Sequence, residues 1–181
     1  MVKLKAISPC QDIPAQTIGS VTMQELAPAA ITSIAVKTGR QKTASQSLKK
    51  QFGFALPGAN RSTGTAGARC VWFGHDQVML LGPRPARIDG ASMTDQSDAW
   101  AVIQLQGRHS RAVLARMVPI DLNADVFKRG HTARTLLGHV PASLTRTGED
   151  RFDLMVFRSM AHTVITEIIH AMSSISAQNP V

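Results

Sequence analysis

Apolar and polar residues alternate in short blocks along the chain, and these blocks predict strands and helices in a repeating order. The run "ITSIAVK" at 31–37 is rich in β-branched residues and predicts a strand. The run "RQKTASQSLKKQFG" at 40–53 has apolar residues every four positions, which predicts a short helix. The run "RCVWFGHDQVMLLGP" at 69–83 has two apolar stretches around "GHD" and predicts a β-hairpin. The first half thus has the order strand, helix, long loop, strand, strand.

The second half of the chain repeats this order. The run "AWAVIQLQG" at 99–107 predicts a strand with two different faces, and "RHSRAVLARMV" at 108–118 predicts a helix with an apolar side and a basic side. An apolar i, i+4 stripe predicts a final helix at 159–172, with Ser159 as its N-cap. Between the two helices, three short antiparallel strands are expected at 132–140, 142–148 and 152–158.

This repetition predicts the fold class. We expect an α+β protein made of two pseudo-repeated strand-helix-strand-strand halves, with antiparallel sheets and helices on one face. A length of 181 residues suits one domain. The expected boundaries are a loose N-terminal arm at 1–25, one α+β domain at 26–175 with halves of about 26–90 and 91–175, and a C-terminal tail at 176–181.

The charge of the chain is unevenly distributed. The formal net charge is +8, and residues 1–90 hold 11 Lys and Arg residues against 4 Asp and Glu residues. A basic half of this kind suits a nucleic acid, an anionic ligand or an acidic partner protein. Nucleic-acid binding is disfavoured, because the chain has no Tyr, only two Trp, and no recognisable nucleic-acid-binding module.

Composition also bears on the cellular compartment. The longest apolar runs are far too short to cross a membrane, and no apolar stretch follows the lysines near the N-terminus as a secretory signal would require. Only Cys10 and Cys70 are present, so a disulfide framework is not expected. The sequence therefore predicts a cytoplasmic protein without a membrane partner.

Three short segments resemble known active-site or phosphate-binding motifs, and we assign each resemblance to chance. Ser47-x-x-Lys50 and Lys37-Thr38-Gly39 match two motifs of penicilloyl-transferring enzymes, but they occur in the wrong order and without the third motif. The segment "GANRSTGTAG" lacks the lysine of a phosphate-binding loop and precedes a strand, so a surface loop is expected there.

Metal binding and thiol chemistry are also disfavoured. Glu167-x-x-His170 is half of a di-iron helix motif, but no second half is present. His162 lies too far from His170 along a helix for the two to share a metal, and the six histidines show no ligand spacing. Cys70 lies in an apolar strand, where a free cysteine acts as a small hydrophobic residue.

The stretch "VPIDLNADVFKRGHTARTLLG" at 118–138 is the densest group of titratable residues. Asp121 and Asp125 could act as an acid/base pair, but "PIDLNAD" also has the pattern of a turn or a helix start, where acidic residues have a structural role. We favour the structural role, since nothing nearby completes a catalytic set. We therefore predict no catalytic, cofactor-binding or metal-binding residue on this chain.

The second half of the chain resembles a known family. The ordered matches are Leu105-x-Gly107, Arg111-x-x-Leu114, Pro119-x-Asp121-Leu122, Phe127, Gly130, Thr135-Leu136-Leu137-Gly138, Phe152 and Arg158-Ser159-x-Ala161. The hairpin at 69–83 is similar to an upstream Trp-rich hairpin of the same family. Over roughly residues 65–172, the chain resembles the gamma subunit of heterotetrameric sarcosine oxidase.

The resemblance implies a fold related to the folate-binding domain of the glycine-cleavage aminomethyltransferase. It also implies partners, because alpha, beta, gamma and delta subunits together oxidise sarcosine to glycine, hydrogen peroxide, and formaldehyde or 5,10-methylenetetrahydrofolate. FAD, FMN, NAD, zinc and tetrahydrofolate are implied for the other subunits. No catalytic residue is assigned to gamma, so the resemblance implies a noncatalytic subunit that supports assembly.

Two other functions remain open from the sequence. One is a free-standing folate-binding protein or aminomethyltransferase-like enzyme, in which Asp121 and Arg134 are the nearest candidates for the pterin and the glutamate tail. The other is a basic nucleic-acid-binding protein, whose affinity would fall steeply with salt.

Overall fold

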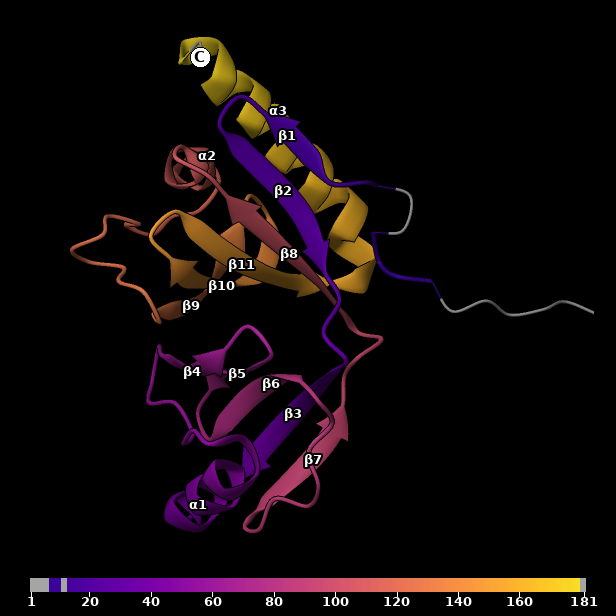
Figure 1. The fold of residues 1–181 in the computed structure, drawn as a ribbon, viewed down its shortest axis with the longest axis vertical. Coiled ribbons are helices and arrows are strands. Elements are labelled where there is room, and N and C mark those ends of the chain that lie inside the picture. The colour runs from indigo at the N-terminus through magenta and orange to yellow at the C-terminus, as the bar shows by residue number, and fades with distance from the viewer. Residues whose placement is uncertain (1–6, 11–12, 180–181) are drawn as a thin grey trace, which may run out of the picture.

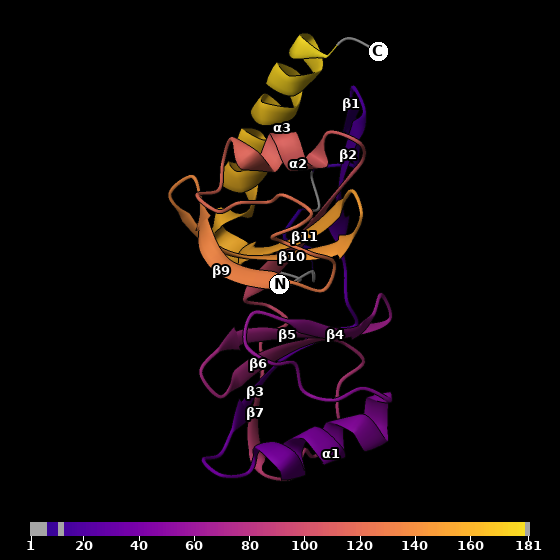
Figure 2. The same cartoon turned by 90° about the vertical axis from the view of Figure 1, so that its left-hand side faces the viewer.

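Strands with one apolar face and one mixed face build two antiparallel sheets, which pack against each other through their mixed faces (Figure 1). The computed structural model describes residues 7–10 and 13–179. Each sheet is covered on its outer face by helices, so the order of layers is helix, sheet, sheet, helix (Figure 2). This arrangement confirms the predicted α+β class with antiparallel sheets.

The five-stranded sheet has the order β4-β5-β6-β3-β7. Its strands are β3 (Ala30–Val36), β4 (Ser62–Thr65), β5 (Ala68–Gly74), β6 (Gln77–Gly82) and β7 (Ala91–Asp95). Helix α1 (Gln41–Phe52) buries Ala44 and Leu48 against this sheet. It ends at Gly53, whose φ of +81° lets the Gly53 N–H donate to the Lys49 carbonyl. The predicted strand, helix and hairpin of the first half are therefore confirmed.

The six-stranded sheet has the order β1-β2-β8-β11-β10-β9. Its strands are β1 (Gln16–Ile18), β2 (Val21–Leu26), β8 (Trp100–Gln106), β9 (Thr132–Leu137), β10 (Val140–Gly148) and β11 (Arg151–Phe157). The helices are α2 (Ser110–Ala115), the 3₁₀ turn η1 (Arg158–Met160) and α3 (Ala161–Gln178). The predicted strand at 99–107 and the three strands after residue 131 are confirmed.

Helix α3 covers the outer face of the six-stranded sheet because its apolar residues follow the helical repeat. Its buried residues are Ala161, Val164, Ile165, Ile168, Ala171, Met172 and Ile175. They pack against the outward side chains of the sheet, among them Leu105, Phe152 and Leu154, each fully buried. The predicted N-cap role of Ser159 is wrong, because η1 precedes the helix and Met160 occupies the N-cap position.

The prediction of a loose arm at 1–25 is wrong for residues 16–25, which contain two strands. Residues 16–18 and 21–26 form β1 and β2, and β2 pairs along β8 from Thr22, opposite Gln106, to Leu26, opposite Val102. Val21 and Met23 are buried under the helices, which holds these short strands in place. Residues 1–6 and 11–12 lie outside the described part of the chain.

Three further boundaries differ from those expected. Strand β7 at 91–95 pairs with β3, so the two halves separate after residue 95 and not at 90. Helix α3 continues to Gln178, so most of the predicted tail at 176–181 is helical; residues 180–181 lie outside the described part. The helix expected at 108–118 is shorter in the structure: α2 ends at Ala115, with Arg116 as its C-cap residue.

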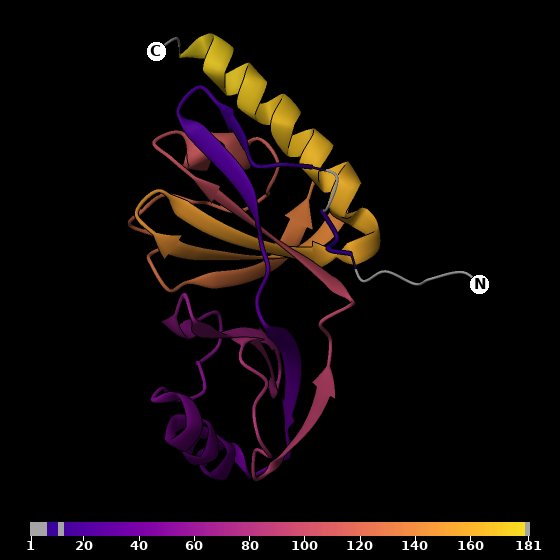
Figure 3. The same cartoon turned by 45° about the vertical axis from the view of Figure 1, so that its right-hand side comes forward.

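The chain passes between the sheets twice, from β2 to β3 and from β7 to β8, so the five-stranded sheet is inserted between two neighbouring strands of the other (Figure 3). The inner faces meet in an apolar cluster, which we call the inter-sheet core: Ile31, Phe73, Met79, Trp100, Val102 and Met155. The Trp100 ring packs edge-on against Phe73 at a centroid distance of 5.2 Å and stacks on Phe157 at 4.5 Å. The two sheets therefore share apolar surface.

Polar contacts add to this junction. The Arg134 guanidinium on β9 lies 4.0 Å from the centroid of the Phe73 ring and donates to the Phe73 carbonyl. Beside it, the Ser62 N–H donates to the Gly130 carbonyl at 2.8 Å, and the Thr132 N–H donates to the Asn60 carbonyl at 3.1 Å. These contacts join β4 and its preceding loop to the start of β9.

No helix within residues 7–10 and 13–179 is long and apolar enough to cross a membrane.

A substitution at Gly107, directly after β8, would test how closely the start of β2 approaches the end of β8. Its φ is +130°, and a Cβ added there would lie 1.9 Å from the Ser20 carbonyl oxygen, a backbone atom that cannot move aside cheaply. We expect Gly107→Ala to lower the free energy of unfolding by about 3 kcal/mol or more, from strain and overlap together. Gly39→Ala is the control, since Gly39 has a φ of +74° and open space around it, and should cost about 1 kcal/mol. Equal losses in urea unfolding would contradict the close approach.

Candidate functional site

A cavity of about 870 Å³ lies between the two sheets, beside the inter-sheet core, and we call it the inter-sheet cavity. Its polar side chains come from both sheets and from the loop before β9. Those used below are Arg69, Gln104, Arg129, Thr147, Arg151 and Asp153. Apolar walls are supplied by Leu26, Leu81 and Val102, which also belong to or flank the inter-sheet core. The cavity thus combines charged groups with an apolar surface.

A hydrogen-bonded row on the inner face of the six-stranded sheet fixes the only carboxylate among the residues that line this cavity. The register places Gln24 opposite Gln104, and Gln104 opposite Asp153. The Gln24 amide donates to Gln104 at 3.1 Å, and the Gln104 amide donates to Asp153 Oδ1 at 2.8 Å. The Thr147 hydroxyl donates to the same oxygen at 3.2 Å. Asp153 Oδ1 is therefore held as a hydrogen-bond acceptor at the cavity wall.

Three arginines give this cavity a positive charge. Burial lowers the pKa of Arg69, the Asp153 carboxylate raises it, and the guanidinium groups of Arg129 and Arg151 lower it further. These influences show that the four charged groups lie within electrostatic reach of one another. With three cations and one carboxylate in its lining, the cavity is chemically suited to accept an anion.

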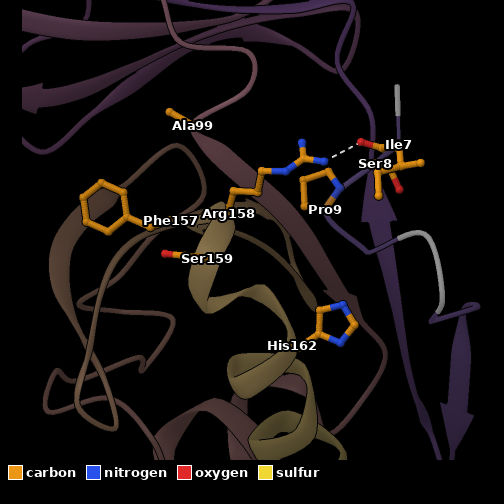
Figure 4. A pocket seen from close by; sticks show the side chains of 8 residues that line it. All are labelled: Ile7, Ser8, Pro9, Ala99, Phe157, Arg158, Ser159 and His162. Carbon is orange, nitrogen blue, oxygen red and sulfur yellow. Dashed lines mark hydrogen bonds between the residues drawn. The ribbon is translucent and has the colours of Figure 1, made fainter. Parts of the chain in front are cut away.

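A second, shallower hollow of about 610 Å³ lies where the N-terminal segment meets the end of β11 (Figure 4). The Arg158 guanidinium donates to the Ile7 carbonyl across it, and His162 lies at its helical side. Phe157 is 43% exposed here although its ring stacks on the buried Trp100. The contact from Arg158 holds residues 7–9 against the six-stranded sheet.

The two predicted acidic candidates lie on an exposed turn. Asp121 Oδ1 accepts the Asn123 N–H at 2.8 Å, which is the local capping role expected for a turn aspartate. Asp125, four residues after Asp121, is also exposed. Leu122 and Phe127 from the same stretch are buried, and the Arg146 guanidinium donates to the Phe127 carbonyl at 2.9 Å. The segment is thus an anchored connection, and neither aspartate lines the inter-sheet cavity.

The other residues weighed from the sequence are dispersed over the fold. Ser47 accepts the Asp89 N–H on the side of α1, and Lys50 is exposed. Glu167 and His170 are both exposed on α3. Within residues 7–10 and 13–179, no three His, Cys, Asp or Glu side chains gather as metal ligands.

The cavity residues escaped prediction because they are far apart in the sequence. Arg69, Arg129 and Arg151 belong to three segments that only the packing of the sheets brings together. The available signal was the polar face of β8 and β11, where Gln104 and Asp153 alternate with buried apolar residues. A polar face on an otherwise buried strand indicates that it lines a polar space.

Two face-to-face antiparallel sheets between outer helical layers define a class of four-layered α+β proteins, here with a cavity at the sheet junction. Within that class, the chain belongs to the GCVT N-terminal domain family, whose model matches residues 71–179.

Individual relatives extend the match over most of the chain. The sarcosine oxidase gamma subunit of Corynebacterium sp. (strain U-96) is 28% identical over 170 residues, which cover 87% of this chain and 82% of that protein. The sarcosine oxidase gamma subunit of Arthrobacter sp. is 24% identical over 176 residues, covering 89% and 84%. The resemblance to sarcosine oxidase gamma subunits is therefore confirmed.

Solved structures share the fold. A chain of heterotetrameric sarcosine oxidase from Corynebacterium sp. U-96, in complex with pyrrole 2-carboxylate, superposes with a TM-score of 0.81 at 23% identity and covers 94% of this chain and 96% of that chain. The glycine cleavage system aminomethyltransferase T from Bartonella henselae has a TM-score of 0.60 at 14% identity, covering 84% of this chain and 46% of that chain. The predicted relation to the aminomethyltransferase fold is confirmed.

The two cysteines provide a test of the packing. Burial and the neighbouring Glu25 carboxylate raise the pKa of the Cys10 thiol to about 12, and burial raises the pKa of the Cys70 thiol far above its ordinary value. Both thiols therefore stay protonated near pH 8, where only a thiolate would react. We expect neither to react with an aromatic disulfide reagent in the folded chain and both to react in denaturant. Rapid labelling of Cys70 in the folded chain would contradict its burial in β5.

Proposed function

We propose that this chain is a noncatalytic gamma subunit of a heterotetrameric sarcosine oxidase and supports assembly of that complex. The complex would oxidatively demethylate sarcosine to glycine, with hydrogen peroxide and formaldehyde or 5,10-methylenetetrahydrofolate as the other products. In this proposal FAD, FMN, NAD, zinc and tetrahydrofolate belong to the alpha, beta and delta subunits.

The observation that carries the proposal is the coverage of the match: it spans most of this chain and also most of each gamma subunit. The chain and the gamma subunits correspond over most of their lengths, in sequence and in fold, whereas the aminomethyltransferase has more than half of its chain outside the match. A protein that corresponds to a whole subunit, and not to part of a larger enzyme, is expected to work as that subunit does.

The positions of the residues considered as catalytic or folate-binding candidates support a noncatalytic role. Both cysteines are buried and protonated, and the Asp121 carboxylate is engaged by a backbone N–H in its own turn. Arg134, the predicted folate candidate, lies over Phe73 at the sheet junction and not beside Asp121 in a shared cavity. These side chains stabilise the fold locally, and a stable fold is what a subunit with an assembly role needs.

Co-expression tests the proposal. An affinity tag on this chain should recover the alpha, beta and delta subunits in a stable complex that releases hydrogen peroxide when sarcosine is added. A stable monomer that ignores the other three subunits would contradict it. Folate titration of the isolated chain gives a second readout, because micromolar binding would instead favour a free-standing folate-binding protein.

Substitution of the two exposed aspartates separates assembly from catalysis. We expect Asp121→Asn with Asp125→Asn to change turnover of the assembled complex by less than about twofold, because surface substitutions outside a site have small effects. Asp98→Asn, also exposed, is the matched control. A hundredfold loss of turnover in an intact complex would instead place the 118–138 stretch in an active site.

A further inference from the structure

We propose that the inter-sheet cavity binds a small organic anion with two or more negative charges, held by the guanidinium groups of Arg69, Arg129 and Arg151. Such a site is independent of the assembly role and would make this chain a ligand-binding subunit as well.

The positive charge of the cavity is only partly compensated by its lining residues. Three arginines and one aspartate line it. Ion pairs between side chains of the described residues lie elsewhere, and none includes a cavity arginine: they are His75–Asp76, Arg84–Asp95 and Arg87–Asp89. An excess of like charges destabilises a fold by repulsion, so a bound anion would stabilise this one.

The three arginines approach from different walls. Arg69 is half-buried on β5 of the five-stranded sheet, Arg151 begins β11 of the six-stranded sheet, and Arg129 lies in the loop before β9. A guanidinium group donates two parallel hydrogen bonds to a carboxylate or phosphate. Three such groups around one space can therefore hold a ligand with several acidic oxygens, where a single surface arginine could not.

Asp153 adds a requirement for a donor on the ligand. Gln104 and Thr147 both donate to its Oδ1, which fixes the carboxylate and leaves its other oxygen free of partners in the described residues. A ligand hydroxyl or N–H could donate to that oxygen. The ligand is thus expected to carry at least one such donor beside its acidic groups, a pattern that sulfate lacks.

The size and walls of the cavity favour a small molecule. Its volume of about 870 Å³ lies within the range of small-molecule sites, and Leu26, Leu81 and Val102 offer apolar contact for a carbon skeleton. The arginines line this recess with different exposure: Arg69 is half-buried, and Arg129 and Arg151 are exposed to an entering ligand.

Citrate is a suitable probe because it carries three carboxylates and one hydroxyl. We expect saturable binding of citrate to the full chain by calorimetry, with a rise in Tm that sodium chloride at matched ionic strength does not reproduce. Arg69→Gln, Arg129→Gln and Arg151→Gln should each weaken citrate about tenfold, the effect of one lost charged hydrogen-bonding group. Arg111→Gln, exposed on α2 at the opposite face of the sheet, is the matched control and should bind citrate normally.

The variants also separate binding from folding. Without citrate, Arg151→Gln should unfold at the same or a higher temperature than the natural chain, because it removes repulsion; Arg151 is exposed, so its loss leaves the core intact. Tricarballylate, which is citrate without the hydroxyl, should bind more weakly if Asp153 accepts that hydroxyl.

Three outcomes would overturn the proposal. One is the absence of saturable citrate binding up to about 10 mM. Another is an equal loss of affinity in Arg111→Gln. The third is binding of a glutamate-rich peptide without binding of citrate, which would assign the arginines to an acidic protein segment.

Discussion

Strand β8 is packed on both of its faces, and this packing ties the two sheets to each other. Ile103 and Leu105 point into the core under α3, while Trp100 and Val102 point into the inter-sheet core. A strand buried on both sides must have a full layer on each side, so neither sheet can be completed without the other. Gln104, on the inner face, then extends from the apolar contact into the cavity and orients Asp153.

Chain connectivity reinforces this dependence. Because the five-stranded sheet is inserted between β2 and β8, the pairing of these strands closes a long loop that contains a whole sheet. The close approach of Ser20 to Gly107 lies at one end of that pairing, and the crossings that Figure 3 shows lie at the other. The cavity forms beside the crossing from β2, where Leu26 is both part of its wall and a neighbour of the inter-sheet core.

Elements with strong periodicity could be predicted from the sequence. The apolar pattern of the hairpin around "GHD" and that of α3 extend over enough residues to specify a hairpin and a helix. Strands β1, β4 and β7 are short or polar edge strands, fixed by their neighbours and not by their own pattern, so they were missed. The cavity arginines could not be grouped, because their proximity arises from tertiary packing alone. The charged 118–138 stretch holds residue types that also serve catalysis, but its turn pattern favoured a structural role, and Asp121 accepts a backbone N–H in its own turn.

These features support the proposed role of the chain in contact and binding. Its defined polar groups hold a junction and line a cavity, and its fold is that of the sarcosine oxidase gamma subunits it resembles. Omission tests whether the chain supports assembly: alpha, beta and delta subunits are produced without it, and the mass of the assembled particle is measured. We expect the full-sized particle to be lost and to be restored when this chain is added. A full-sized, fully active particle without this chain would show that it has no assembly role.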